Sequence, residues 1–270
     1  MKTISLLPAL AGLILGAAFA VRAAGTEPTG NSGIRQLEAR ALAPGDGHLM
    51  YTETHWLYAD NGVPARLVLY RCPDGRAFAR KWLRQDGAPQ APDFELVDGR
   101  SGYREGVRKA GTGRIVFVRP GGGEPERTAP LPDASDLVID AGFDAYIRQH
   151  WDRLGHGESD TVPFLIPSRL GALDFKVRRL DDAVVEGRPV RRYRLGLASW
   201  IGFALPHIDV AYDAADRQLL QFVGLANIRG SNGDNVRARI VFDPSAAHAA
   251  TPAALDAARA APLDGRCPIP

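Results

Sequence analysis

Residues 140–157 show the spacing of apolar side chains that is typical of one face of an α-helix. The apolar face holds Phe143, Tyr146, Ile147, His150, Trp151 and Leu154, and the opposite face holds Asp144, Arg148, Gln149, Asp152 and Arg153. Asp140 is a suitable N-cap because its carboxylate can accept hydrogen bonds from the N–H groups of the first turn. Gly155 can adopt the left-handed conformation that ends a helix. We therefore predict an amphipathic helix over residues 141–154.

Most of the remaining chain shows the alternation and the turn residues of β-strands. Residues 236–242 alternate cleanly, with Val236 and Ile240 on one face against Arg237 and Arg239 on the other. Asn-Gly steps are typical of two-residue hairpin turns, and we expect one at Asn232 and Gly233 and a further turn at residues 60–62. We expect strands over 48–58, 65–72, 76–84, 94–97, 102–108 and 113–119 before the helix, and over 161–167, 174–180, 189–197, 208–212, 218–225 and 236–242 after it.

Two strand-rich halves flank a single helix, which indicates a mainly β (α+β) fold. The simplest arrangement is one strongly curved antiparallel sheet, an incomplete β-barrel wrapped around the central amphipathic helix. We place this domain at residues 47–245, between a flexible lead-in at 24–46, with a short helix near 34–37, and a C-terminal tail at 246–270. Two separate β domains joined by the helix are the alternative, but they would leave Ile147 and Trp151 without a core.

The first 23 residues have the pattern of a secretory signal peptide. Lys2 precedes an uncharged apolar stretch over 4–20, and small residues allow cleavage after Ala20 or after Ala23. A retained membrane anchor is the alternative, but the stretch is short for one and Pro8 interrupts it. We expect an exported mature protein without a transmembrane segment.

Charge and composition refine the expected location. The 33 basic and 31 acidic residues give a net charge of +2, which processing would bring closer to neutral, so nucleic acid is not an expected partner. Lysine is rare and arginine, alanine and glycine are abundant, as in proteins from GC-rich bacterial genomes. We therefore expect the periplasm. In that oxidising compartment Cys72 and Cys267 are candidates for a disulfide, and the alternative is two free thiols.

Several segments together carry a family resemblance. They are Phe143 to Trp151, residues 164–170 (FLIPSRL), Tyr212 with Asp213, and residues 224–228 (GLANI). This combination resembles an uncharacterised family of exported proteobacterial proteins. More distantly, residues 95–108 (ELVDGRSGYREGVR) resemble the periplasmic lipoprotein-carrier superfamily. That second resemblance implies an incomplete β-barrel closed by helices around a hydrophobic cavity for acyl chains.

An uncharged apolar segment at 195–208 supplies most of the candidate ligand contacts. It allows two interpretations: a loop at the mouth of an apolar cavity, or a buried corner packed on the central helix. With the helix it gives the ligand-cavity candidates Phe143, Ile147, Trp151, Leu195, Leu197, Trp200, Ile201, Phe203 and Leu205. Nearby, Arg191, Arg192 and Arg194 are candidates for an anionic head group, or are the solvated outer face of a sheet.

The histidines do not define a metal site or a catalytic set. Glu53 shares a strand face with His55, and His207 shares one with Asp209. Either pair is a fragment of a ligand set or an acid–base pair, or simply a hydrogen bond within the sheet, because no third partner is evident. We predict no metal, no cofactor and no catalytic residue.

These observations lead to one functional expectation with two alternatives. We expect a non-catalytic protein that binds or carries a lipophilic or amphiphilic ligand, a lipid or an acylated molecule, in the cell envelope. A structural or interaction protein with an envelope protein partner and a fully packed core is the first alternative. A hydrolase is the second, and a cluster of carboxylate and histidine groups with shifted pKa values in a cleft would favour it.

Overall fold

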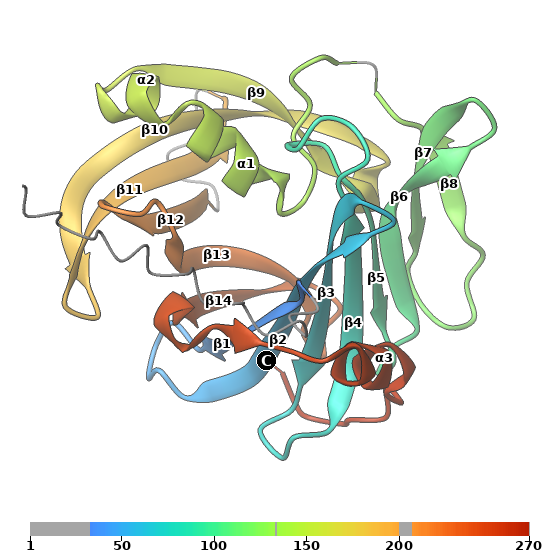
Figure 1. Ribbon diagram of the computed structural model, residues 1–270. Helices are drawn as coiled ribbons and strands as arrows, with labels where there is room; N and C mark the ends of the chain where they lie inside the picture. Colours follow the sequence, from blue (N-terminus) through green and yellow to red (C-terminus); the bar gives the residue numbers. More distant parts are fainter. Residues whose placement is uncertain (1–32, 133, 200–206, 270) are drawn as a thin grey trace, which may run out of the picture. The chain divides into compact units, whose positions relative to one another are not determined.

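The computed structural model describes residues 33–132, 134–199 and 207–269, and most of them lie in one antiparallel sheet (Figure 1). The strands before the first helix are β1 (Arg35–Leu42), β2 (Leu49–Asp60), β3 (Val63–Arg71), β4 (Ala77–Arg84), β5 (Asp93–Asp98), β6 (Tyr103–Ala110), β7 (Gly113–Arg119) and β8 (Arg127–Pro130). Those after it are β9 (Ser159–Ile166), β10 (Gly171–Val185), β11 (Arg188–Leu197), β12 (His207–Asp213), β13 (Leu219–Arg229), β14 (Asn235–Phe242) and β15 (His248–Ala249). The α-helices are α1 (Gly142–Gln149), α2 (Trp151–Gly155) and α3 (Pro252–Ala260), and short 3-10 turns lie at Pro167–Arg169 and Pro244–Ala246.

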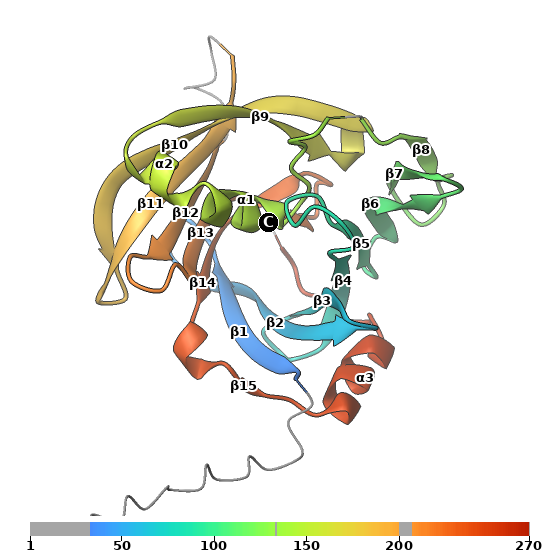
Figure 2. The same cartoon turned by 45° about the horizontal axis from the view of Figure 1, so that its top comes forward.

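The sheet consists of two meanders joined at its middle. Strands β1 to β8 follow one another in one direction, β14 to β9 follow in the other, and β1 pairs with β14. The edge strands β8 and β9 are consecutive in the chain, and the described residues show no pairing between them. Figure 2 shows the sheet curving so that α1 lies between its two halves. The predicted fold class, a curved antiparallel sheet that does not close, is confirmed.

The hairpins follow from local turn chemistry. Asn61 and Gly62 have φ values of 50° and 82°, and they connect β2 to β3 directly, because Asp60 and Val63 are register partners. A two-residue turn with positive φ at both positions matches the right-handed twist of the strands. The expected turn at residues 60–62 is therefore present, whereas the two-residue hairpin predicted at Asn232 and Gly233 is wrong, because residues 230–234 lie between the register partners Arg229 and Asn235.

The predicted central helix differs from its expected form at both ends and in the middle. It is divided into α1 and α2 at His150, which has non-helical φ and ψ of −103° and 19°. The first helix is capped at Ala141 without a side-chain hydrogen bond, so Asp140 is not the N-cap. Asp140 has a φ of 47°, and its carboxylate is engaged by the sheet instead. The buried face is as predicted: Ile147 and Leu154 have no exposed surface.

The flexible lead-in predicted for 24–46 is wrong from Arg35 onward. Residues 35–42 form β1, and the short helix near 34–37 is not present. Strand β1 carries few β-branched or aromatic side chains, so its sequence alone gives a weak strand signal. It is a strand because β2 and β14 supply backbone partners on both sides, and its small side chains Ala39 and Ala41 are buried.

The C-terminal tail predicted for 246–270 is packed on the sheet. Strand β15 pairs with β1, and α3 lies along the outer face of β3 (Figures 1 and 2). Leu255 of α3 packs with Leu67 and Leu69, the outward positions of a strand whose alternate residues point inward. Cys267, beyond α3, forms a disulfide with Cys72. The helix therefore buries apolar positions that a solvated outer face would expose.

Candidate functional site

The concave side of the sheet encloses a cavity of about 600 Å³ next to α1. Its apolar lining comes from both meanders and from the segments around α1. These residues include Leu37, Leu57, Val68, Leu83, Phe94, Phe143, Phe164, Leu165, Ile166, Phe175, Ile208, Leu219, Phe222, Ile228, Ile240 and Phe242. The cavity has the size and the apolar character of a small-molecule site.

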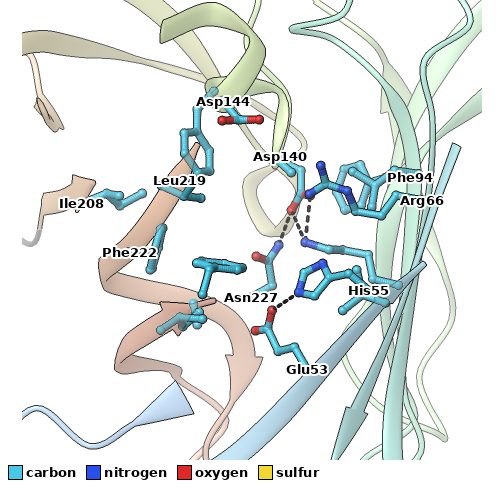
Figure 3. A pocket seen from close by; sticks show the side chains of 18 of the residues that line it. Glu53, His55, Arg66, Phe94, Asp140, Asp144, Ile208, Leu219, Phe222 and Asn227 are labelled. Carbon is cyan, nitrogen blue, oxygen red and sulfur yellow. Dashed lines mark hydrogen bonds and ion pairs between the residues drawn. The ribbon is translucent and has the colours of Figure 1, made fainter. Parts of the chain in front are cut away.

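Polar side chains gather on one wall of this cavity. Strand alternation puts every second residue of β2 and β3 on the inner face, and this wall carries polar and charged groups among the apolar ones. They are Glu53, His55, Arg66, Lys81, Glu105, Asp140 and Asn227, the polar cluster shown in part in Figure 3. Their backbones belong to β2, β3, β4, β6, the turn before α1, and β13.

Glu53 and His55 form a buried pair within β2. The Oε2 atom of Glu53 lies 2.9 Å from Nε2 of His55, and each residue is 5% exposed. Burial lowers the pKa of His55, because it penalises the imidazolium, and the hydrogen bond and charge of Glu53 offset this only in part. The imidazole is therefore favoured in its neutral form at neutral pH.

Lys81 and Asn227 both bind the Asp140 carboxylate. The Lys81 Nζ lies 2.9 Å from Oδ2, and Nδ2 of Asn227 donates to Oδ1 at 2.6 Å. Burial would raise the pKa of Asp140, but the charge and hydrogen bonds of Lys81, with further hydrogen bonds, bring it below its ordinary value. The carboxylate is thus held ionised in the interior and fixes the start of α1.

Glu105 lies in the same wall, and its pKa is shifted in the opposite direction to that of Asp140. The Tyr103 hydroxyl donates to its Oε2 at 2.6 Å, and Nη2 of Arg229 donates to the same hydroxyl at 2.8 Å. Burial raises the pKa of Glu105 above its ordinary value, against the hydrogen bond from Tyr103 and the charge of Arg229. The cavity wall therefore holds carboxyl groups whose pKa values are shifted in opposite directions.

Two side chains that line the cavity, Tyr51 and Arg66, have polar groups that can bind a ligand. The Tyr51 hydroxyl is buried and has no hydrogen-bond partner in the described part of the chain. Burial, followed by the charge of Glu53, raises its pKa well above the ordinary value, so the hydroxyl keeps its proton. Arg66 lines the cavity without an ion pair to any carboxylate of the described residues. Both groups are available as donors to a ligand.

The predicted ligand contacts are only partly at this cavity. Phe143 lines it, whereas Ile147, Trp151 and Leu195 do not, because they are buried in the core. The Trp151 ring packs against Tyr193 and Tyr212, with centroids 5.7 and 5.9 Å away. Leu197, at the end of β11, is not among the lining residues either. Trp200, Ile201, Phe203 and Leu205 lie outside the described residues.

The three candidate head-group arginines also lie away from the cavity. The Arg191 guanidinium sits 5.1 Å from the Trp151 ring centroid. The Arg192 Nε donates to the Asp181 carbonyl at 2.8 Å. Arg194 binds both carboxylate oxygens of Asp209 at 2.6 and 2.7 Å. The head-group assignment is therefore wrong for this cavity, since these cations cover the core or pair along the sheet.

Sequence reasoning found the Glu53–His55 pair but not the rest of the polar cluster. Lys81 and Asn227 both contact Asp140, although they lie 59 and 87 residues away from it in the sequence. Their only local signal is that Lys81 is one of few lysines and shares a strand face with Ala79 and Leu83. Among the described residues no group of histidine, cysteine and carboxylate side chains could hold a metal ion. No helix of the described ranges is long and apolar enough to cross a membrane.

Comparisons with known proteins assign no family and no function to this chain. No protein-family model matches the chain, and no curated protein matches it. A matching solved structure is a beta-barrel-like protein of the domain of unknown function DUF1849 from Brucella abortus. The two chains are 7% identical with a TM-score of 0.46, and the match covers 81% of this chain and 98% of the other. We draw no functional inference from a similarity of this degree.

Proposed function

We propose that this protein is a non-catalytic binding or carrier protein for an amphiphilic ligand of the cell envelope. The supporting observation is the cavity of about 600 Å³ that combines an apolar lining with a buried polar cluster. An acyl chain or another lipophilic body would occupy the apolar part. The polar group of the ligand would lie against Arg66. The Tyr51 hydroxyl lies farther along the sheet, because Arg66 pairs with Leu57, and it would bind a second polar atom of the ligand.

The energetics of the cavity support a ligand more than an empty interior. Burying apolar surface contributes roughly 25 cal/mol per Å², so a lipophilic molecule gains from leaving water. The unpaired Tyr51 hydroxyl leaves a buried hydrogen-bonding group that a ligand can satisfy, and an unsatisfied buried group costs about 1–3 kcal/mol. A fully packed structural protein, the alternative, would lack such a cavity.

We place this function in the periplasm. The supporting observations are the leader pattern of residues 1–23 and the disulfide between Cys72 and Cys267. Disulfides form and persist in oxidising compartments and are rare in the cytosol. Cell fractionation of the native host, with a periplasmic marker, tests the assignment.

The cavity is tested by extracting and identifying co-purified lipid by native mass spectrometry, together with uptake of a fluorescent fatty acid. Leu219 lines the cavity (Figure 3), so Leu219→Trp fills part of it and should weaken uptake by tenfold or more. Val184 is 68% exposed on β10 and outside the lining, and Val184→Trp is the matched control with unchanged uptake. The absence of both co-purified lipid and uptake would overturn the proposal.

Acid–base catalysis on a bound ligand is a second candidate function. The observation that favours it is the set of buried groups in one cavity whose pKa values are shifted in opposite directions, upward for Glu105 and downward for His55. Assay of the protein against ester and amide substrates, with His55→Gln and Glu53→Gln as variants, tests this candidate. Turnover that both variants abolish would favour it over simple binding.

A further inference from the structure

We propose that a second pocket of this protein, next to the disulfide, binds an anionic oxyacid group such as a phosphate. The proposal is independent of the ligand cavity and goes beyond the function proposed above. The pocket has a volume of about 760 Å³. It is formed by β6, β7, β8, the turn between β13 and β14, and the segment at 266–269. Its lining includes Arg100, Arg127, Arg229 and Arg266, and none of its described lining residues is an aspartate or glutamate.

Arg100 lies in the pocket wall, where hydrogen bonds hold its guanidinium in place and an ion pair neutralises its charge. Its Nε and Nη2 atoms donate to the two oxygens of Asp98 at 3.0 and 2.6 Å, and Nη2 also donates to the carbonyl of Arg229 at 2.7 Å. Both partners of the ion pair are largely buried. Arg100 therefore orients the wall but adds little excess charge.

Arg229 is fixed in place but keeps its charge. Its guanidinium stacks 4.1 Å from the Tyr103 ring centroid and donates to the Gly233 carbonyl at 2.6 Å and to the Tyr103 hydroxyl at 2.8 Å. Its Nε is buried without a hydrogen-bond partner in the described chain. No carboxylate of the described residues pairs with it directly, since Glu105 is reached only through the tyrosine hydroxyl.

Arg127 and Arg266 supply accessible charge at the same pocket. Both are exposed, and neither pairs with a carboxylate of the described residues. Glu126, the acid next to Arg127 in sequence, binds Arg108 instead. Arg266 donates to the carbonyl of Gly265 at 3.0 Å, which leaves its charge uncompensated.

The guanidinium groups of Arg127, Arg229 and Arg266 therefore line one pocket, and none of them forms an ion pair with a carboxylate of the described residues. Like charges at close quarters raise the free energy of the site, and a bound anion removes that cost. The planar donor fork of arginine matches two oxygens of a phosphate or carboxylate at once. Ser101, Ser231 and the glycines of the β13–β14 turn also line the pocket and leave room for an oxyanion. The geometry thus favours an anion with several oxygen acceptors.

This site is tested by titrating inorganic phosphate into the full mature protein and measuring the heat of binding by calorimetry at low and at high salt. The test variant carries both Arg127→Gln and Arg266→Gln, because both side chains are exposed and their loss should leave the fold intact. The matched control is Arg40→Gln with Arg237→Gln, which removes the same charge from exposed positions on β1 and β14 outside the pocket lining.

We expect saturable phosphate binding that weakens at least tenfold in the Arg127 and Arg266 variant and is unchanged in the control. An equal loss in both variants, or no saturable binding by the native protein, would overturn the proposal. Vesicles with and without phosphatidylglycerol separate the two sources of phosphate. Vesicle binding lost in the same variant indicates a lipid head group, and phosphate binding without vesicle binding indicates a soluble phosphate compound. Unchanged fatty-acid uptake in the variant separates this site from the cavity.

Discussion

The Lys81 ammonium and the Asp140 carboxylate form an ion pair of 2.9 Å inside the curved sheet (Figure 3). Lys81 lies in β4, and Asp140 lies in the turn immediately before α1. Only 10% and 2% of the two side chains are exposed. Asp140 has a φ of 47°, a conformation that aspartate adopts more readily than most residues. The pair therefore anchors the turn before α1 to β4.

Removing one partner of this pair should be strongly destabilising. Lys81→Met leaves a buried carboxylate with only Asn227 and backbone groups around it, and loss of one partner of a buried pair costs about 3–5 kcal/mol. Urea unfolding followed by tryptophan fluorescence measures the change. Asp74→Asn breaks the exposed pair with Arg76 and should leave the midpoint unchanged. An equally small effect of both substitutions would contradict the anchoring role.

His55 should make the protein less stable on the acid side of neutrality. Its folded-state pKa is lowered from 6.5 by burial, so the unfolded chain takes up the proton first. Stability from this group is complete above pH 6.5 and is lost as the pH falls toward the folded-state pKa. Thermal unfolding between pH 7.5 and pH 5 should show a smaller acid-side decline in His55→Gln. An identical decline in wild type and variant would contradict this assignment.

Glu105 should contribute a pH dependence of the opposite sign. Its folded-state pKa is raised from 4.5 by burial, so the folded protein keeps the proton longer than the unfolded chain does. The associated stability is complete below pH 4.5 and is lost as the pH rises through the folded-state pKa. Glu105→Gln should therefore remove a loss of stability with rising pH. Denaturant unfolding of the two proteins from pH 4 upward measures it, with Glu124→Gln at an exposed position as control.

The disulfide should stabilise the C-terminal segment against the sheet. Cys72 and Cys267 are 195 positions apart, and removing a cross-link between distant residues typically costs about 2–5 kcal/mol. Cys267→Ser should lower the free energy of unfolding by this amount under non-reducing conditions. Reductant should bring the wild-type protein to the level of the variant and leave the variant unchanged. Equal stability without reductant would show that the cross-link does not contribute.

Local patterns in the sequence were sufficient for the fold class and for much of the core. The alternation of Val236 and Ile240 with arginines, and the Asn-Gly turn at Asn61, are properties of a few adjacent residues, so they can be read without the tertiary structure. The same is true of the apolar face that includes Ile147 and Leu154. Strand β1 could not be found in this way, because its small side chains become a strand only between β2 and β14.

The candidate site depended on the tertiary structure. Polar residues such as Arg66 and Lys81 in a strand are usually solvated, and nothing local distinguishes them from the arginines of β11. The curvature of the sheet turns Arg66 and Lys81 toward the cavity, whereas the Arg191 guanidinium lies over the Trp151 ring. Sequence by itself determined most of the segments that become strands and which helix face is buried, because both depend on short periodicities. Only the tertiary structure decided which charges meet, because their partners come from distant strands that the curvature of the open sheet brings together near α1.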